Sequence, residues 1–210
     1  MASMQIGIIG AGHIGATVAG LFVKAGHEVA VSNSRGPESI ASLVSEIGPT
    51  ARATTVEEAA SFGEVVLLAI PWRGLDGLPS PQTLAGKIVI DAMNPYSANF
   101  EIVDLGDSTS SEEVAKRLPG ARIVKAFNTM YFEMLRTGGQ VSVKDRLVLF
   151  VAGDDTGAKD AVSRLIDEIG FASVDTGTIR EGGRRQQPGS PIYNKPMTVD
   201  QARAALAAAP

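Results

Sequence analysis

Six consecutive residues near the N-terminus have the spacing of a phosphate-binding loop, Gly10-Ala11-Gly12-His13-Ile14-Gly15. In such a loop the first glycine allows a tight turn, the second lets the backbone approach a diphosphate, and the third lets the next helix pack closely. The amides that begin the helix then attract the anion. A glycine-rich turn without a ligand is the alternative. Because an apolar strand precedes the motif and a helical pattern follows it, the sequence predicts a dinucleotide site formed by residues 10–15.

The segment Ser32-Asn33-Ser34-Arg35 occupies the position that distinguishes NAD-binding from NADP-binding proteins. Proteins that bind NAD place an acidic residue about 20 residues after the loop, where it accepts from the ribose 2′-hydroxyl. Here no acid occurs before Glu38. Hydroxyls and a guanidinium instead suit charge-assisted bonds to a 2′-phosphate. Arg35 could also be a solvated arginine in a polar turn. We expect NADP(H) as the cofactor, bound in part by Ser32, Asn33, Ser34 and Arg35.

Two later segments should flank the nicotinamide ribose and ring, namely Ile70-Pro71-Trp72 and Asn94-Pro95. Each follows an apolar run, and in open α/β sheets ligands bind beyond the carboxyl ends of the strands. Trp72 either walls the nicotinamide ring or covers the sheet. Asn94 either hydrogen-bonds the ribose or carboxamide or shapes the turn before Pro95. We include all five residues among the expected cofactor-binding residues.

The chain offers few groups for metal or triad chemistry. It has no cysteine and only two histidines. His13 and His27 flank the first expected helix, on the order of 20 Å apart, which is too far to share a metal or a substrate proton. No serine–histidine–aspartate triad is plausible. We expect His13 to pack in the loop or contact the cofactor, and His27 to be a polar turn residue.

Candidate proton donors are also sparse. They are Tyr96, Lys125, Tyr131, Tyr193 and Lys195, and no Tyr-x-x-x-Lys spacing occurs. Reduction of a carbonyl needs a proton donor beside the substrate. Hydride exchange between NADPH and a flavin-like ring needs less from the protein, because the cofactors carry the chemistry and the protein holds the rings in contact. We therefore expect no catalytic side chain and no metal ligand.

These residues need a sheet to position them. Apolar runs predict strands at 4–9, 28–32, 51–54, 64–70, 87–92, 121–127, 146–152 and 172–175, the last as an edge strand. Helical spacing occurs at 14–25, 40–47, 56–60, 112–118 and 158–169, and a short helix follows Thr198. Strands that alternate with helices imply a mainly parallel sheet covered on both faces. We expect a doubly wound α/β fold of the Rossmann, NAD(P)-binding type, with a nucleotide-binding core at 1–127 and a C-terminal extension at 128–210 packed on the same sheet.

Composition limits the partners. The chain has 210 residues, a formal net charge of -4 and no lysine- and arginine-rich run, which argues against nucleic-acid or membrane-surface binding. No apolar run reaches the ~18 residues of a membrane helix. The N-terminus lacks the features of a signal peptide. We expect a cytoplasmic protein, a homodimer, that acts on a small-molecule hydride acceptor.

Five motifs together resemble the NADPH:coenzyme F-420 oxidoreductase family. They are the glycine loop, Ser34-Arg35, Ile70-Pro71-Trp72, Val124-Lys125-Ala126-Phe127-Asn128-Thr129 and Phe150-Val151-Ala152-Gly153-Asp154-Asp155. That family shares its nucleotide-binding domain with the cytosolic part of the STEAP ferric reductases, and the resemblance covers most of residues 4–180. It implies NADPH at the glycine loop, a deazaflavin stacked on the nicotinamide, and Asn128 and Thr129 toward the acceptor.

The tail departs from the family pattern. A loop rich in glycine and arginine replaces a longer apolar helix that helps to build the deazaflavin pocket in archaeal members. Arg184, with Arg180 and Arg185, could receive an acidic acceptor tail, or the loop could be solvated or form a dimer contact. We expect residues 180–196 to form a lid over the acceptor, with Gly182, Gly183 and Gly189 as flexible points.

The leading hypothesis from the sequence is an NADP-dependent oxidoreductase that transfers a hydride between NADP(H) and a flavin or deazaflavin similar to coenzyme F-420. One alternative is an NADPH-dependent reductase of another small acceptor, such as a quinone, an imine or a ferric chelate. Another is a non-catalytic redox sensor that binds NADP(H). Turnover of NADPH with a panel of acceptors separates the three.

Overall fold

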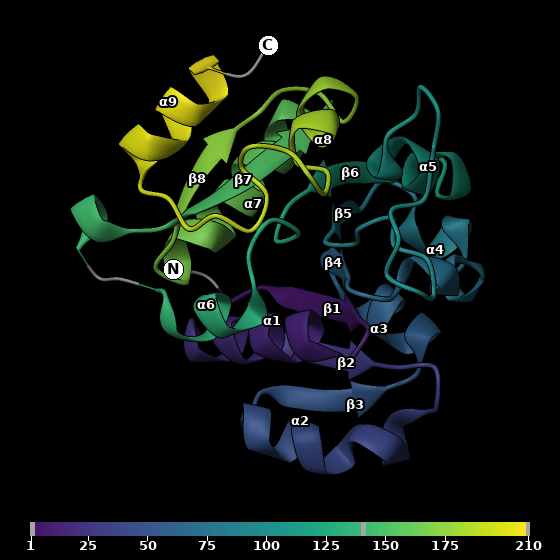
Figure 1. Ribbon diagram of the computed structural model, residues 1–210. Helices are drawn as coiled ribbons and strands as arrows, with labels where there is room; N and C mark the ends of the chain where they lie inside the picture. The colour runs from purple at the N-terminus through teal and green to yellow at the C-terminus, as the bar shows by residue number, and fades with distance from the viewer. Residues whose placement is uncertain (1–2, 140–141, 209–210) are drawn as a thin grey trace.

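The computed structural model describes residues 3–139 and 142–208, and an eight-stranded sheet forms its centre (Figure 1). The strand order is β3-β2-β1-β4-β5-β6-β7-β8. Every neighbouring pair is parallel except β6 and β7, which are antiparallel. The strands are β1 (Gln5–Ile9), β2 (Glu28–Ser32), β3 (Ala51–Thr54), β4 (Val65–Leu68), β5 (Ile88–Asp91), β6 (Arg122–Lys125), β7 (Val148–Gly153) and β8 (Ala172–Asp175). The order reverses between β1 and β4, which is where open α/β sheets bind ligands.

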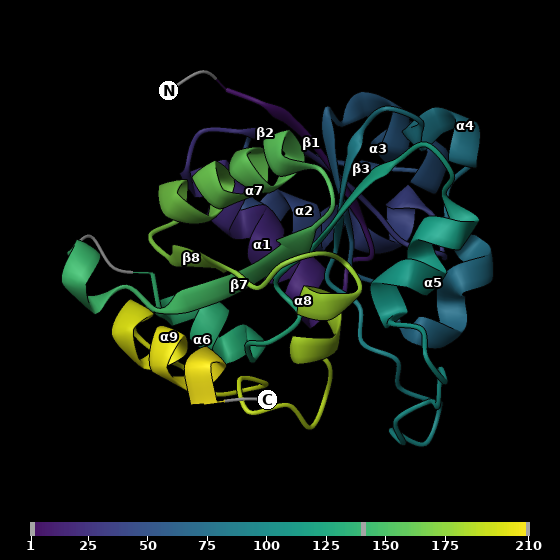
Figure 2. The ribbon, with the colours of Figure 1, turned by 90° about the horizontal axis from the view of Figure 1, so that it is seen from above.

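Helices cover both faces of the sheet (Figure 2). Adjacent Ile8 and Ile9 of β1 belong to different apolar clusters, because successive strand side chains point to opposite faces. One face is covered by α1 (His13–Lys24), α2 (Ala41–Ile47), α6 (Phe132–Thr137) and α7 (Thr156–Glu168). The other is covered by α3 (Val56–Phe62), the 3-10 helix η2 (Trp72–Gly77), α4 (Pro81–Leu84) and α5 (Ser110–Arg117). Two further 3-10 helices are η1 (Pro37–Ile40) and η3 (Val143–Asp145).

The C-terminal part adds a third apolar cluster. Val148 and Phe150 of β7 pack with Ile192 of the tail and Ala202 of α9 (Val199–Ala208). The backbone N–H of Thr198 donates to Gln201 Oε1, as expected for a cap of this helix. The tail therefore covers the β7–β8 end of the sheet.

The doubly wound, mainly parallel α/β fold predicted from the sequence is confirmed. Three expected strands, 28–32, 51–54 and 172–175, have the predicted bounds, and the last is an edge strand. The sequence did not predict α6 or α8 (Glu181–Arg185), since both are under two turns long and have little apolar periodicity.

Two local expectations were wrong. His27 is buried, not a polar turn residue: its Nδ1 accepts from the Met4 backbone N–H, and its Nε2 lies 2.8 Å from Glu168 Oε2. Gly182 and Gly183 are buried, not flexible points. A Cβ at Gly182 would lie 2.5 Å from Thr176 Oγ1, so this glycine is required by close packing. Within the described residues, no helix has the length and apolarity needed to span a membrane.

Candidate functional site

The glycine loop connects β1 to α1 as the sequence predicts. Gly10 has φ +113°, and a Cβ there would lie 2.3 Å from the Ala69 carbonyl oxygen. A Cβ at Gly15 would lie 1.8 Å from the Gly10 carbonyl oxygen. Gly12, the residue that precedes α1, has no atom within 4 Å of a Cβ. Gly10 and Gly15 thus close the loop onto the strand and helix, while Gly12 leaves space for a ligand at the amides of the helix N-terminus.

A cavity of about 620 Å³ opens beside this loop at the carboxyl ends of β2, β1 and β4. Its walls come from residues 9–12 of the loop, 33–35 after β2 and 69–71 after β4, together with Val56, Gly74 and Gly77. Asn33 Oδ1 accepts from the Arg35 backbone N–H at 3.0 Å, which orders the turn. Ser34 and Arg35 are exposed at the cavity. This arrangement offers amides to a diphosphate and a guanidinium to a further phosphate.

Two residues expected at the cofactor make contacts within the protein. Ser32 is fully buried, and its hydroxyl donates to the Ile8 carbonyl at 3.1 Å. Its carbonyl in turn accepts from the Gly10 backbone N–H at 2.9 Å. Trp72 packs against the apolar cluster under η2 and is outside the wall of this cavity. Ser32 therefore shapes the loop, and Trp72 covers the sheet.

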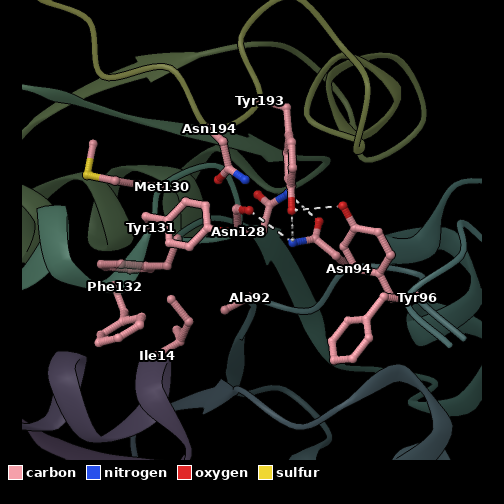
Figure 3. A pocket seen from close by; sticks show the side chains of 12 residues that line it. Ile14, Ala92, Asn94, Tyr96, Asn128, Met130, Tyr131, Phe132, Tyr193 and Asn194 are labelled. Atoms are coloured by element: carbon pink, nitrogen blue, oxygen red, sulfur yellow. Dashed lines mark hydrogen bonds between the residues drawn. The ribbon is translucent and has the colours of Figure 1, made fainter. Parts of the chain in front are cut away.

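A second cavity, of about 380 Å³, lies at the ends of β5 and β6 (Figure 3). Among the described residues its wall is uncharged and largely aromatic. The wall consists of Ile14, Ala92, Asn94, Tyr96, Phe100, Phe127, Asn128, Met130, Tyr131, Phe132, Tyr193 and Asn194. Ile14 follows two residues after Gly12, and β5 is the neighbour of β4. The two cavities consequently lie side by side along the carboxyl edge of the sheet.

A hydrogen-bond network crosses the wall of the second cavity. Asn94 Nδ2 donates to the Asn128 carbonyl (3.0 Å) and to Tyr193 Oη (3.2 Å). Asn128 Nδ2 donates to Asn94 Oδ1 (3.0 Å) and to the Gln186 carbonyl (2.9 Å). The Tyr96 hydroxyl donates to Tyr193 Oη at 3.4 Å. Figure 3 shows these side chains meeting at one side of the cavity. The network joins the strand ends to the tail.

The remaining residues predicted to bind the cofactor or the acceptor lie in different surroundings. His13 stacks on Phe132, with ring centroids 4.2 Å apart. Thr129 is buried, and its carbonyl accepts from the Asn194 backbone N–H. Pro95 is buried behind Asn94. Arg184 is outside the wall of the second cavity, and its Nη2 donates to the Asp107 carbonyl at 2.7 Å.

Sequence reasoning missed most of the second cavity as a site. The sequence indicates Tyr193 only as a candidate proton donor, and it indicates no role for Phe132, Met130 or Asn194. The useful signal was the density of aromatic and asparagine residues in the segments 127–132 and 193–194.

A buried ion pair lies beneath the strand ends. Lys125 Nζ donates to Asp91 Oδ2 (3.0 Å), to Ser110 Oγ (3.1 Å) and to the Met93 carbonyl. Ser111 Oγ donates to the same carboxylate oxygen at 2.7 Å. Burial lowers the pKa of Lys125 from its ordinary value, and Asp91 opposes that shift. The pair fixes the turn that leads to Asn94. Within the described residues, no group of three acidic, histidine or cysteine side chains is arranged to hold a metal ion.

This chain is similar in sequence to oxidoreductases and reductases. The family described as NADP oxidoreductase, coenzyme F420-dependent, matches residues 5–95. Metalloreductase STEAP3 of Rattus norvegicus is 33% identical over 176 residues, which cover 83% of this chain. The match spans only 34% of the length of that relative.

Solved structures extend the similarity to nearly the whole chain. The hypothetical protein SMa0349 from Sinorhizobium meliloti is 34% identical, with a TM-score of 0.82, over 93% of this chain and 95% of that one. A protein from Arthrobacter sp. FB24 with an ascribed F420-dependent NADP reductase activity is 26% identical, with a TM-score of 0.74, over 84% of this chain and 86% of that one. More distant dehydrogenases and imine reductases, at 16–18% identity, share the fold.

Proposed function

The chain belongs to the family of coenzyme F420-dependent NADP oxidoreductases, and on that premise we propose that it reduces a flavin or deazaflavin ring with a hydride from NADPH. The observation that carries this proposal is the pair of adjoining cavities. One is lined by the glycine loop, Ser34 and Arg35, and the other is uncharged and aromatic.

In this proposal the first cavity binds NADP(H). The amides at the start of α1 hold the diphosphate beside Gly12, whose missing side chain leaves the required space. Ser34 and Arg35 hold the 2′-phosphate, since no acid stands before Glu38 to repel it. Bound NADPH supplies the hydride, and the protein supplies its position.

The second cavity receives the acceptor ring. Tyr96, Tyr131, Tyr193 and Phe132 provide flat apolar surfaces on which a planar ring can stack. The volume of about 380 Å³ falls within the range of small-molecule sites. Ile14, two residues after Gly12, and Ala92, directly after β5, give this cavity an apolar wall that keeps water from the acceptor ring.

Other acceptors remain as alternatives. The name of STEAP3 describes a metalloreductase, so a ferric chelate must be tested. The uncharged wall argues against it, because an anionic chelate is attracted by cationic side chains and the described wall has none.

The experiment mixes the protein with NADPH and, separately, riboflavin, 5-deazariboflavin, a quinone, a cyclic imine and ferric citrate, and follows nicotinamide absorbance. We expect turnover with the ring compounds. Turnover of ferric citrate or the imine alone would contradict the proposed acceptor. Tight NADPH binding without any turnover would favour a redox sensor.

We also propose that the protein is a cytoplasmic homodimer in which residues 180–196 border the acceptor. Tyr193 and Asn194, which line the second cavity, support the position of that segment. Light scattering during size-exclusion chromatography measures the mass: a value of one 21.9 kDa chain contradicts the dimer.

A further inference from the structure

The hydroxyl of Tyr193 accepts two hydrogen bonds in the wall of the second cavity. It accepts from Asn94 Nδ2 at 3.2 Å and from the Tyr96 hydroxyl at 3.4 Å. A phenol that accepts two hydrogen bonds still has its own proton to donate. The tail that presents it is fixed on both sides: Asn128 Nδ2 donates to the Gln186 carbonyl, and the Asn194 N–H donates to the Thr129 carbonyl.

The other proton donors named from the sequence are placed less well. Lys125 is fully buried and directs its ammonium at Asp91, Ser110 and Met93, away from the cavity wall. Lys195 is exposed and outside the wall. Tyr131 lines the cavity, but its side chain is 61% exposed. Tyr96 lines the cavity too, but its hydroxyl proton is already donated to Tyr193.

We propose that Tyr193 is a catalytic residue that hydrogen-bonds the acceptor atom that gains electron density and gives it a proton as the hydride arrives. This role rests on the proposed function. It changes the expectation that no side chain takes part in the chemistry.

The proton and electrons balance as follows. NADPH gives a hydride, which is two electrons and one hydrogen nucleus, to a ring carbon of the acceptor and becomes NADP+. The electron pair displaced within the ring forms the new bond to hydrogen at a nitrogen or oxygen, and Tyr193 supplies that proton. Tyr96 then returns a proton to Tyr193 along their hydrogen bond, and water restores Tyr96. The sum is acceptor, NADPH and one proton giving reduced acceptor and NADP+.

The surroundings suit this role. Burial raises the pKa of Tyr193 above its ordinary value of 10.0, and contact with Tyr96 raises it further, so the hydroxyl keeps its proton at neutral pH. The groups that interact with it are the amides of Asn94 and Asn194 and the phenols of Tyr96 and Tyr131. The hydrogen bond that Asn94 donates stabilises the phenolate for the moment after transfer.

The test compares two acceptors in the Tyr193→Phe variant. Reduction of 5-deazariboflavin requires a hydride and a proton, whereas N-methylacridinium gains only a hydride. We expect kcat with 5-deazariboflavin to fall about a hundredfold or more. The rate with N-methylacridinium and the Kd of NADPH should stay close to wild type. Lys195→Met, two residues along the same tail and outside the cavity wall, is the control and should retain both rates.

Binding gives a readout that does not depend on turnover. Loss of one hydrogen bond should weaken 5-deazariboflavin binding in the presence of NADP+ by about two- to tenfold, measured by fluorescence quenching. An unchanged melting temperature shows that the variant is folded. Should the variant lose stability, Tyr96→Phe replaces it, with a smaller loss confined to 5-deazariboflavin expected.

The outcomes separate the two proposals. Unchanged reduction and binding of 5-deazariboflavin by Tyr193→Phe would overturn the role of Tyr193 alone, and so would an equal loss with both acceptors. Failure of the wild-type protein to bind or reduce either ring would overturn the proposed function together with this role.

Discussion

The ammonium group of Lys125 lies 3.0 Å from the carboxylate of Asp91, and both side chains are fully buried beneath the ends of β5 and β6. Each charge depends on the other, because neither is solvated. The same ammonium donates to the Met93 carbonyl, directly before Asn94 of the second cavity. The ion pair therefore links the stability of the sheet to the geometry of the site.

Removing one partner should be costly. We predict that Lys125→Met lowers the free energy of unfolding by about 3–5 kcal/mol, because it leaves the Asp91 carboxylate buried without its counter-charge. Replacing both residues, as Asp91→Leu with Lys125→Met, should cost clearly less than the single change. Urea unfolding measures both. Lys116→Met, at an exposed position, is the control and should lower the free energy of unfolding by less than about 1 kcal/mol. A double variant as unstable as Lys125→Met would contradict the pairing.

Substitutions of two loop glycines should have different effects, one on stability and the other on NADPH binding. Gly15→Ala places a Cβ against the Gly10 carbonyl oxygen and should destabilise the protein by about 1–3 kcal/mol. Gly12→Ala has open space around it and should change stability by less than about 0.5 kcal/mol. Because that space is where we place the diphosphate, Gly12→Ala should weaken NADPH binding about tenfold or more. Thermal unfolding and fluorescence titration measure the two effects, and unchanged NADPH affinity in folded Gly12→Ala would count against the site.

Arg35 should decide the choice of cofactor. A hydrogen bond to a charged group contributes about 1.5–3 kcal/mol, so Arg35→Ala should weaken NADPH binding about 10- to 100-fold. NADH lacks the 2′-phosphate, and its affinity should barely change. Arg164→Ala, exposed on α7, is the control for a lost surface charge. Isothermal titration with both nucleotides measures the effect; equal losses for NADPH and NADH would contradict the assignment.

The sequence predictions succeeded where a structure depends on residues close together in the chain and failed where it depends on distant ones. The loop from Gly10 to Gly15 was predictable because its conformation depends on neighbours in the chain, and apolar runs placed every strand of the sheet. Ser32 and Trp72 show the limit. Their residue types suit a ligand, but which way each side chain points is decided by contacts with Ile8 and with the cluster under η2.

The acceptor side was harder to predict for a related reason. Asn194 meets Thr129, and Tyr193 meets Asn94 and Tyr96, across long separations in the chain. No local pattern encodes such contacts. The division into 1–127 and 128–210 and the lid role of 180–196 stay predictions, although β7 and β8 join the same sheet.

The alkaline stability of the protein should report on Tyr193. Burial raises the pKa of its folded-state hydroxyl above the ordinary 10.0. The folded protein then holds this proton at a pH where the unfolded chain has lost it, so the contribution is fully present below pH 10 and is lost as the pH rises through the folded-state value. Tyr193→Phe removes this contribution, and the free energy of unfolding should decline less steeply above pH 10 than in the wild-type protein. Urea unfolding at a series of alkaline pH values measures the slope. Tyr131→Phe removes a hydroxyl from an exposed ring of the same cavity and is the control. A slope unchanged by Tyr193→Phe, or changed equally by both variants, would show that the Tyr193 hydroxyl is not held in the buried network.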